Sequence, residues 1–241
     1  EDDNSAWRVN PVHFAERHGL FIIIVLGEVL VAIGVAAREH EVTLLVAGAV
    51  VASAFLAGVI FWSYFGFVSR FGEEGLKVGH GLERARLARD FFTYGHFPLV
   101  LGVAFLASVI EHVVAEPEGH LHDEQLWLLG TAVALIGGGF MWLQWRLRRR
   151  VAPERPVAIA VVLGFLALGA PHIGGVAVIA IVGAVMAASQ TITASRVAPH
   201  RWGSARPRGR RNLRSVRSVG TVSRQLRASR EAAIAGMIVS P

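Results

Sequence analysis

Residues 13–30 read HFAERHGLFIIIVLGEVL, and this stretch decides the fold of the chain. The eighteen positions from residue 20 to residue 37 carry a single charged side chain, that of Glu28. A helix rises about 1.5 Å per residue, so eighteen residues cross most of a hydrocarbon core roughly 30 Å thick. The stretch therefore predicts a membrane-spanning helix that holds one carboxyl group.

Glu28 is the costly residue of this predicted helix. Steps of three and four residues place His13, Arg17 and Glu28 on one face, with Leu20 and Ile24 between them. A charge near the bilayer centre costs at least about 2.5 to 3.5 kcal/mol, so this face is expected to meet protein or trapped water. Two interpretations stay open: a protonated Glu28 that joins helices, or a carboxyl group that helps to move a proton, ion or substrate.

The composition excludes a water-soluble domain. Of the 241 residues, 53% are hydrophobic and 17% are charged, and the mean hydropathy is +0.49. Cysteine is absent, which excludes disulfides, thiolate catalysis and metal sites with sulfur ligands. The acidic start Glu1-Asp2-Asp3 is the opposite of a basic leader, and the chain is expected to begin inside a longer protein.

The hydrophobic runs predict an all-α fold, a polytopic transmembrane helix bundle with about six spanning helices in residues 1–195. The last two spans come from one apolar run, 157–194, which Pro171 is expected to divide. The aromatic cluster 61–65 fits an interfacial belt. The predicted spans are 14–37, 42–68, 91–115, 125–145, 156–170 and 173–194.

The basic residues orient the predicted bundle. Six spans place 23 of the 24 lysines and arginines on one side, and only Arg38 falls on the other. Positive residues accumulate in the cytoplasm, so both termini are expected there. Residues 196–241 hold eleven of the basic residues and no acid before Glu231. Their composition predicts a disordered cytoplasmic tail that is attracted to anionic lipid headgroups. Nucleic-acid binding is not expected, because interleaved aromatics and a folded reader are missing.

Ionisable groups inside the spans are the candidate functional residues. Such groups are expensive in a membrane and commonly mark the path of an ion or a substrate. His96 and Glu111 share a face of the third span but lie about 22 Å apart along its axis, so each needs a partner from another helix. We expect a polar track formed by His13, Glu16, Arg17, Glu28, His96, Glu111 and His112.

Enzyme chemistry finds little support in the sequence. His13 and Glu16 form half of a metal motif, with no second histidine at the required spacing. The loop 118–124 holds two histidines and three acids, but a solvated acidic loop explains it as well as a metal site does. No catalytic residue, metal or cofactor is therefore predicted, and the chain is not expected to be an enzyme.

Two segments resemble a known family. HFAERHGLFIIIVLGE at 13–28 and YGHFPLVLGVAFLASVIEHVVAEP at 94–117 are similar to the bacterial low temperature requirement protein A family, and the resemblance covers about residues 7–195. It implies a multi-pass protein of the bacterial inner (plasma) membrane whose name describes growth in the cold rather than a reaction. The positions that it highlights are His13, Glu16, Arg17, Gly19, Glu28, His96, Pro98, Glu111 and His112.

The resemblance also implies a partner. Members of the family usually begin with an earlier membrane half that carries a Phe-Phe-Asp-Leu-Val-Phe type motif, and nothing in this chain corresponds to it. A missing N-terminal membrane half or another subunit is therefore expected beside the lipid bilayer itself. Two functions stay open: a transporter or channel-like protein, with proton coupling as one form, and a structural or sensory membrane protein whose buried charges only fix helix packing.

Overall fold

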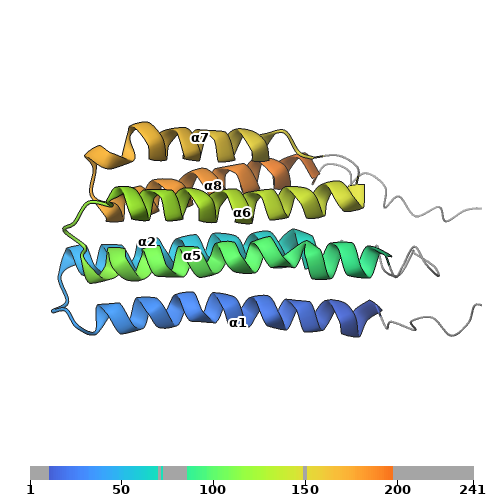
Figure 1. Ribbon diagram of the computed structural model, residues 1–241, viewed down its shortest axis with the longest axis horizontal. Coiled ribbons are helices and arrows are strands. Elements are labelled where there is room, and N and C mark those ends of the chain that lie inside the picture. Colours follow the sequence, from blue (N-terminus) through green and yellow to red (C-terminus); the bar gives the residue numbers. More distant parts are fainter. Residues whose placement is uncertain (1–10, 70–71, 73–85, 149–150, 198–241) are drawn as a thin grey trace, which may run out of the picture. The chain divides into compact units, whose positions relative to one another are not determined.

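The computed structural model describes residues 11–69, 72, 86–148 and 151–197 (Figure 1). Helices make up nearly all of these residues, and no strand forms within them; His120 and Gly174 form an isolated bridge. The all-α fold class is therefore confirmed. The predicted tail, 196–241, lies outside the described residues except for Arg196 and Val197, which end the last helix.

Long helices follow one another along the chain, and π-helical turns interrupt them at two points. The first π-helix, η1, continues α2 without a break, and the second, η2, leads into α5. In chain order the helices are α1 (Pro11–Ala37), α2 (Leu44–Ser63), η1 (Tyr64–Val68), η2 (Ala88–Tyr94), α5 (His96–Ala115), α6 (Asp123–Arg148), α7 (Glu154–Leu168), the short 3-10 helix η3 (Ala170–His172) and α8 (Gly175–Val197).

Five of the described helical segments are long and apolar enough to cross a membrane. They correspond to α1, α2 with the start of η1, η2 with α5, α6 and α8. α7 is the exception, because its 15 residues reach only about 22 Å. It lies where a short fifth span is expected from the sequence, so the described chain has five spanning helices and a sixth, shorter one. This is the structure of a multi-pass membrane protein.

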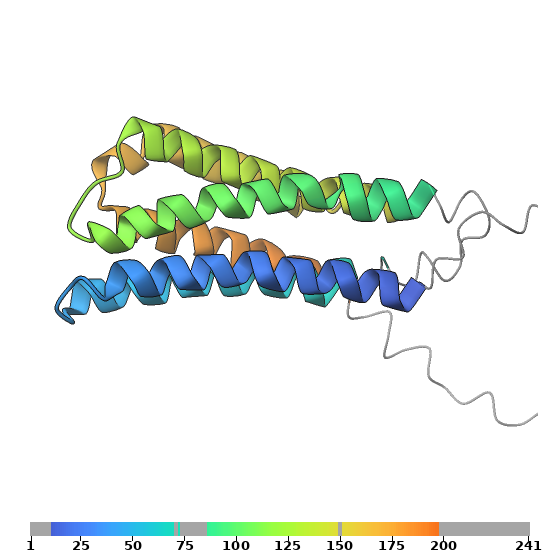
Figure 2. The same cartoon turned by 60° about the horizontal axis from the view of Figure 1, so that its bottom comes forward.

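α5 occupies the middle of the bundle. It packs against α1 on one side and α6 on the other, α2 contacts both α1 and α5, and α7 packs against α6 (Figures 1 and 2). α8 approaches α2, where a Cβ atom on Gly183 would lie 3.1 Å from the Phe55 ring. Consecutive long helices alternate in direction, so the segments 38–43, 116–122 and 169–174 lie at one end, called here the connection end (Figure 1).

Small residues let α5 and α6 approach closely. A Cβ atom on Gly102 of α5 would lie 3.0 Å from the carbonyl oxygen of Ala132 on α6, and one on Gly139 of α6 would lie 2.8 Å from the Leu99 side chain on α5. Close contact between backbones is a common basis of helix association in lipid. The neighbouring Gly138 has nothing within 4 Å of the corresponding position. The two helices are therefore joined through particular glycines.

Candidate functional site

Three polar side chains from three helices meet in the interior, at the end of the bundle opposite the connection end. His18 belongs to α1, Tyr64 begins η1 and His96 begins α5. The exposed fraction is 1% for Tyr64 and 2% for His96, while His18 is partly buried. We call these residues the imidazole cluster. Polar groups buried at this depth between membrane-length helices require hydrogen-bond partners.

The hydrogen bonds of His96 fix the state of its ring. Its Nδ1 lies 3.1 Å from the carbonyl oxygen of Phe91, and its Nε2 lies 2.8 Å from the hydroxyl oxygen of Tyr64. A carbonyl oxygen only accepts, so in the neutral ring Nδ1 carries the proton and donates to Phe91. Nε2 is then the acceptor, and the hydroxyl group of Tyr64 donates to it.

The π-helical turns make this arrangement possible. In η2 the N–H group of Gly95 donates to Asp90, five residues back, at 3.0 Å. In an ordinary α-helix the N–H group of Gly95 would instead donate to the carbonyl oxygen of Phe91. Here this oxygen is free to accept a hydrogen bond from Nδ1 of His96. π-helical turns inside α-helices occur frequently at functional sites. Both π-helices of the described chain contribute to the cluster, because η2 provides the carbonyl group of Phe91 and η1 begins with Tyr64.

Aromatic rings surround the two imidazoles. The rings of His18 and His96 have centroids 5.2 Å apart, and Phe92 stacks on His96 at 5.6 Å with 9° between the planes. His18 donates from Nδ1 to the carbonyl oxygen of Phe14 at 2.9 Å, by the same argument from the carbonyl acceptor. Phe14 also packs on the His18 ring, with centroids 4.7 Å apart. The cluster therefore consists of a hydrogen-bonded pair, Tyr64 and His96, with the His18 ring beside it, within a largely aromatic surrounding.

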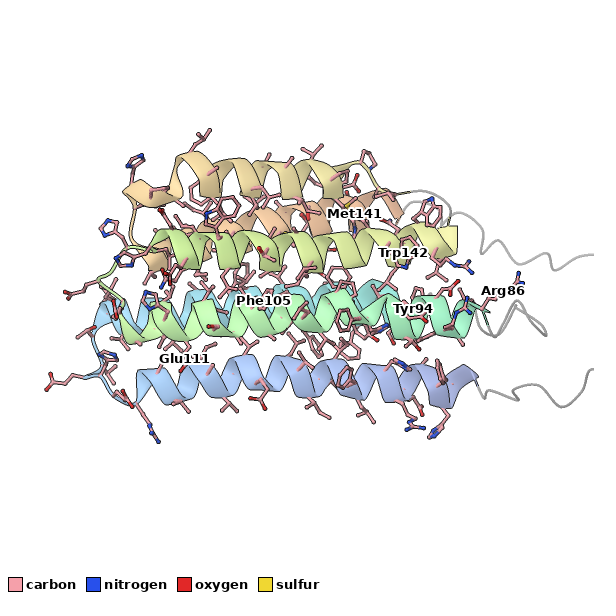
Figure 3. The ribbon with its side chains drawn as sticks, viewed as in Figure 1. Arg86, Tyr94, Phe105, Glu111, Met141 and Trp142 are labelled. Atoms are coloured by element: carbon pink, nitrogen blue, oxygen red, sulfur yellow. The ribbon has the colours of Figure 1, made fainter. Side chains whose placement is uncertain are left out.

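The structure places the seven predicted site residues in different surroundings. His96 is buried in the imidazole cluster, and His112 is partly buried. The other five side chains, those of His13, Glu16, Arg17, Glu28 and Glu111, are exposed in this chain. Figure 3 shows Glu111 near the connection end, far along the bundle from Tyr94. The described helices do not gather the seven around one cavity, and the polar track stays a prediction.

Two members of the cluster were missing from the predicted site. His18 lies within the quoted motif at 13–28, one residue after Arg17, and this adjacency was the available signal. Tyr64 was placed in an aromatic belt. Its neighbour Trp62 is 70% exposed, as a belt requires, but Tyr64 is turned into the core. Tyr64 continues the buried face of α2 that Ser53, Ala57 and Ile60 form at steps of three and four residues, so the helical repeat was the available signal.

Polar contacts also join other helices at the end that holds the cluster. Arg146 of α6 donates to the carboxylate of Asp90 in η2 at 3.3 Å. Arg155, which is buried near the start of α7, donates to the amide oxygen of Gln190 on α8 at 3.2 Å and lies over the ring of Phe140. These contacts tie α6, α7 and α8 to the rest of the bundle, and the sequence did not single them out.

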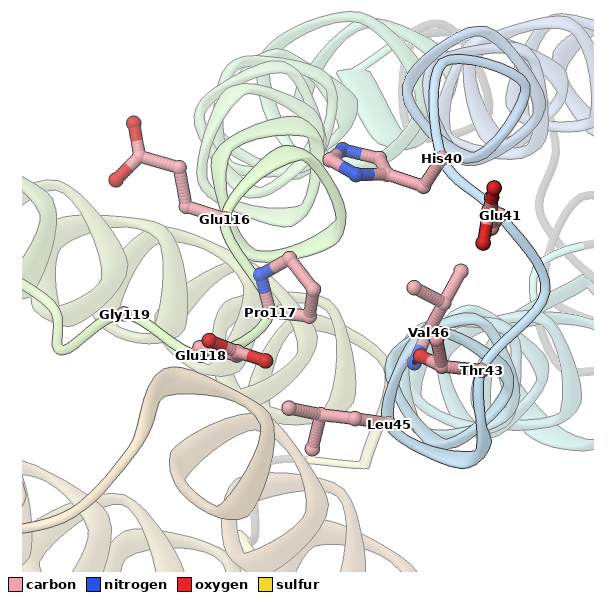
Figure 4. Close-up of a pocket in the computed structure, with 9 residues that line it drawn as sticks. All are labelled: His40, Glu41, Thr43, Leu45, Val46, Glu116, Pro117, Glu118 and Gly119. Atoms are coloured by element: carbon pink, nitrogen blue, oxygen red, sulfur yellow. Dashed lines mark hydrogen bonds between the residues drawn. The ribbon is translucent and has the colours of Figure 1, made fainter.

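A pocket with a volume of about 560 Å³ opens at the connection end (Figure 4). His40 and Glu41 line it from the first connection, and Glu116 and Glu118 line it from the second. The His40 ring reaches toward the second connection, whereas the Glu116 carboxylate points away (Figure 4). Among the described residues, no three histidine, aspartate or glutamate side chains lie close enough together to hold a metal ion.

The fold and the cluster together define a polytopic membrane protein with a hydrogen-bonded polar group buried between its helices. Residues 1–190 match the family model described as Bacterial low temperature requirement A protein (LtrA). The chain belongs to this family, and the resemblance seen in the two motifs is confirmed.

Gly19 of the first motif packs its Cα face against the Phe65 ring, where a Cβ atom would lie 3.3 Å away.

A curated relative extends well beyond this chain. The uncharacterized protein RA0937 of Rhizobium meliloti (strain 1021) is 32% identical over 154 residues, which cover 60% of this chain and 35% of that protein. The chain thus spans about a third of the length of the relative that it matches. No solved structure matches the chain.

Proposed function

We propose that this chain forms part of a proton-linked membrane transporter in which the imidazole cluster carries the proton. The hydrogen bond of 2.8 Å between Tyr64 and His96 carries the proposal. Histidine is the side chain best suited to exchange protons near neutral pH. A polar group in the interior of a membrane bundle is destabilising unless it has a hydrogen-bond partner. Ionisable residues in such places commonly belong to proton relays.

The cluster can take up a proton without a change in the backbone. A proton that reaches Nε2 of His96 turns this atom from an acceptor into a donor, while Nδ1 keeps its bond to Phe91. The hydroxyl group of Tyr64 then accepts instead of donating, which requires only rotation about its C–O bond. Release of the proton reverses both changes.

Within the cluster, His18 is the residue through which we propose that a proton reaches the Tyr64–His96 pair. It is less buried than His96, and its ring centroid lies 5.2 Å from that of His96. Two imidazolium ions at this distance would repel each other strongly in a medium of low dielectric constant. We therefore propose that the pair passes one proton at a time.

The remaining predicted residues extend this proposal along the bundle. His13, Glu16 and Arg17 lie on α1 at the cluster end, Glu28 lies farther along the same helix, and Glu111 and His112 lie near the connection end. They thus occupy several depths of the membrane. We propose that they form the rest of the polar track, with the transported species unspecified.

The test is gradient-driven flux in sealed proteoliposomes that contain the full-length protein and a pH-sensitive dye. We expect His96→Gln and Tyr64→Phe each to lower proton flux at least about a hundredfold, the lower end of the range typical of general acid–base groups. Tyr94→Phe is the matched control, because Tyr94 is the other tyrosine of the chain and is 63% exposed. Equal flux in all three variants would contradict the proposal.

A structural or sensory role is the second candidate, and the same bond favours it, because Tyr64 and His96 join η1 to α5. If the role is structural or sensory, His96→Gln and Tyr64→Phe lower the stability of the protein. The wild-type protein then shows no proton flux either. Turnover that persists in unsealed vesicles would indicate an enzyme instead. The three outcomes are distinguishable within one set of preparations.

We also propose a location and orientation for the chain. The family description is bacterial, and a six-span reading of the sequence assigns 23 of the 24 basic residues to one side of the membrane. Positive residues favour the cytoplasm, so we place the chain in the inner membrane with both termini inside. The arginine-rich tail would then meet the anionic lipid of the inner leaflet, and a further membrane half or subunit would complete the assembly.

A further inference from the structure

The exposed half of α1 carries a carboxylate at the depth of the membrane interior. The candidate span runs from Val12 to Ala37, and Glu28 lies about one turn from its midpoint. The side chain is exposed, and no hydrogen bond or ion pair joins it to any residue that the structure describes. α1 contacts α2 and α5, but these helices cover only its other side.

Large apolar side chains surround Glu28 on the same exposed half of α1. Ile24 and Val31, one turn before and one turn after it, are 64% and 58% exposed, and Leu20 and Val35 continue the surface. Ala37, the nearer end of the span, is nine residues away, which corresponds to about 13 Å. A glutamate side chain is too short to reach water over that distance. Lipid tails cannot supply the hydrogen bond that the carboxyl group needs.

We infer that this face of α1 docks another membrane-spanning helix, which presents a hydrogen-bond donor to Glu28 at mid-depth. Arginine is the best match, because its guanidinium group binds a carboxylate through two parallel hydrogen bonds. Gly34, which is exposed, and Gly27, which is partly exposed, lie two turns apart on α1 with open space beside both, so a partner helix can approach closely. The inference concerns a partner and does not depend on proton transport.

The source of this helix is a different segment rather than a second copy of α1. Two copies meeting symmetrically through this face would oppose Glu28 to Glu28, with only apolar side chains around them, and one carboxyl group would have to stay protonated to donate to the other; a cationic donor on a different helix binds the carboxylate without this requirement. The relative from Rhizobium meliloti has nearly two thirds of its length outside the region shared with this chain. A protein of that length has room for additional membrane helices.

Photo-cross-linking of the full-length protein in native membranes tests the inference. The photoreactive residue p-benzoylphenylalanine replaces Ile24 or Val31, both of which are exposed, so the substitutions leave the described core unchanged. We expect the adduct to map by mass spectrometry to a membrane helix other than α1, with an Arg, Lys, His, Asn or Gln side chain within one turn of the cross-linked position. The matched control is Val161 of α7, which is 52% exposed and apolar, and it should not give the same adduct.

Three results would overturn the inference. These are an adduct with α1 of a second copy, adducts with lipid alone, and the same protein adduct from the Val161 control. A second measurement tests the bond itself. Glu28→Arg should lower the amount of folded protein in the membrane at least about threefold, and replacing the mapped donor with Glu should restore it. Failure of this exchange would mean that the neighbouring helix does not bind Glu28.

Discussion

At the scale of single residues, the clearest result is that two carbonyl groups fix the state of two histidines. Phe14 and Phe91 each accept from an Nδ1 atom, so the Nε2 atom of each neutral ring is left with the lone pair. Only His96 has a tyrosine at that atom. The hydrogen bonding of the two imidazole rings therefore differs by the hydroxyl group of Tyr64. Removing this hydroxyl group tests its contribution.

We expect Tyr64→Phe to lower the free energy of unfolding by about 1 kcal/mol, because Nε2 of His96 loses its donor while it stays buried. The measurement is thermal unfolding in detergent. The control, Tyr94→Phe, removes a hydroxyl group from a side chain on the surface and should change stability by less than about 0.5 kcal/mol. A loss equal to that of the control would mean that the hydrogen bond is not maintained.

A second residue-scale prediction concerns the start of α2. The hydroxyl oxygen of Thr43 accepts from the backbone N–H group of Val46 at 3.2 Å and caps the helix. Thr43→Ala should therefore cost about 1 kcal/mol of stability. Thr131→Ala on α6 removes a hydroxyl group that only donates to the preceding turn, at Trp127, and it should have little effect. Equal melting temperatures for the two variants would contradict the capping role.

Among the helices, α5 and α6 depend on each other most closely, and their contact yields a third prediction. Gly102→Ala places a Cβ atom 3.0 Å from a backbone oxygen of α6, which cannot move aside without shifting the helix. We expect a loss of about 1 to 3 kcal/mol, typical of overpacking. Gly138→Ala is the control, because nothing lies within 4 Å of its added atom. Unfolding in detergent measures both, and equal stability would show that the helices are not tightly packed there.

The elements also show what could be predicted from the sequence. Spanning helices were predictable, because a membrane demands apolar runs of a minimum length. Pro171 lies in η3, between α7 and α8. The π-helical turns were not predictable, because they change side-chain directions over a few residues without altering hydropathy. His96 was recognised as a candidate because it is ionisable and lies within a predicted span, whereas Tyr64 was assigned to an aromatic belt at the end of a span. The helix that we infer beside Glu28 has no counterpart among the described helices.

At the scale of the whole membrane domain, alternating helices predict on which side each connection lies. The chain has no native cysteine, so single cysteines can be introduced without background. We expect Glu41→Cys, Glu118→Cys and Pro171→Cys to react with a membrane-impermeant maleimide in cells whose outer membrane alone is permeable. Pro153→Cys, at the other end, should react only after the inner membrane is opened.

Labelling of Pro171→Cys from the same side as Pro153→Cys would show that α7 does not cross the membrane. Such a result would leave five spanning helices and put the two termini on opposite sides. The agreement of Glu41→Cys and Glu118→Cys is the internal control, since α5 and α6, which flank the second of these connections, both have full membrane length.

The shortness of α7 has a consequence for the surrounding lipid. A helix of 15 residues is about 8 Å shorter than an average hydrocarbon layer, and the bilayer accommodates such a mismatch by thinning locally. Headgroups and water would then dip beside α7 and lower the barrier to charge movement along that flank. Bilayers made from short acyl chains should relieve this deformation beside α7.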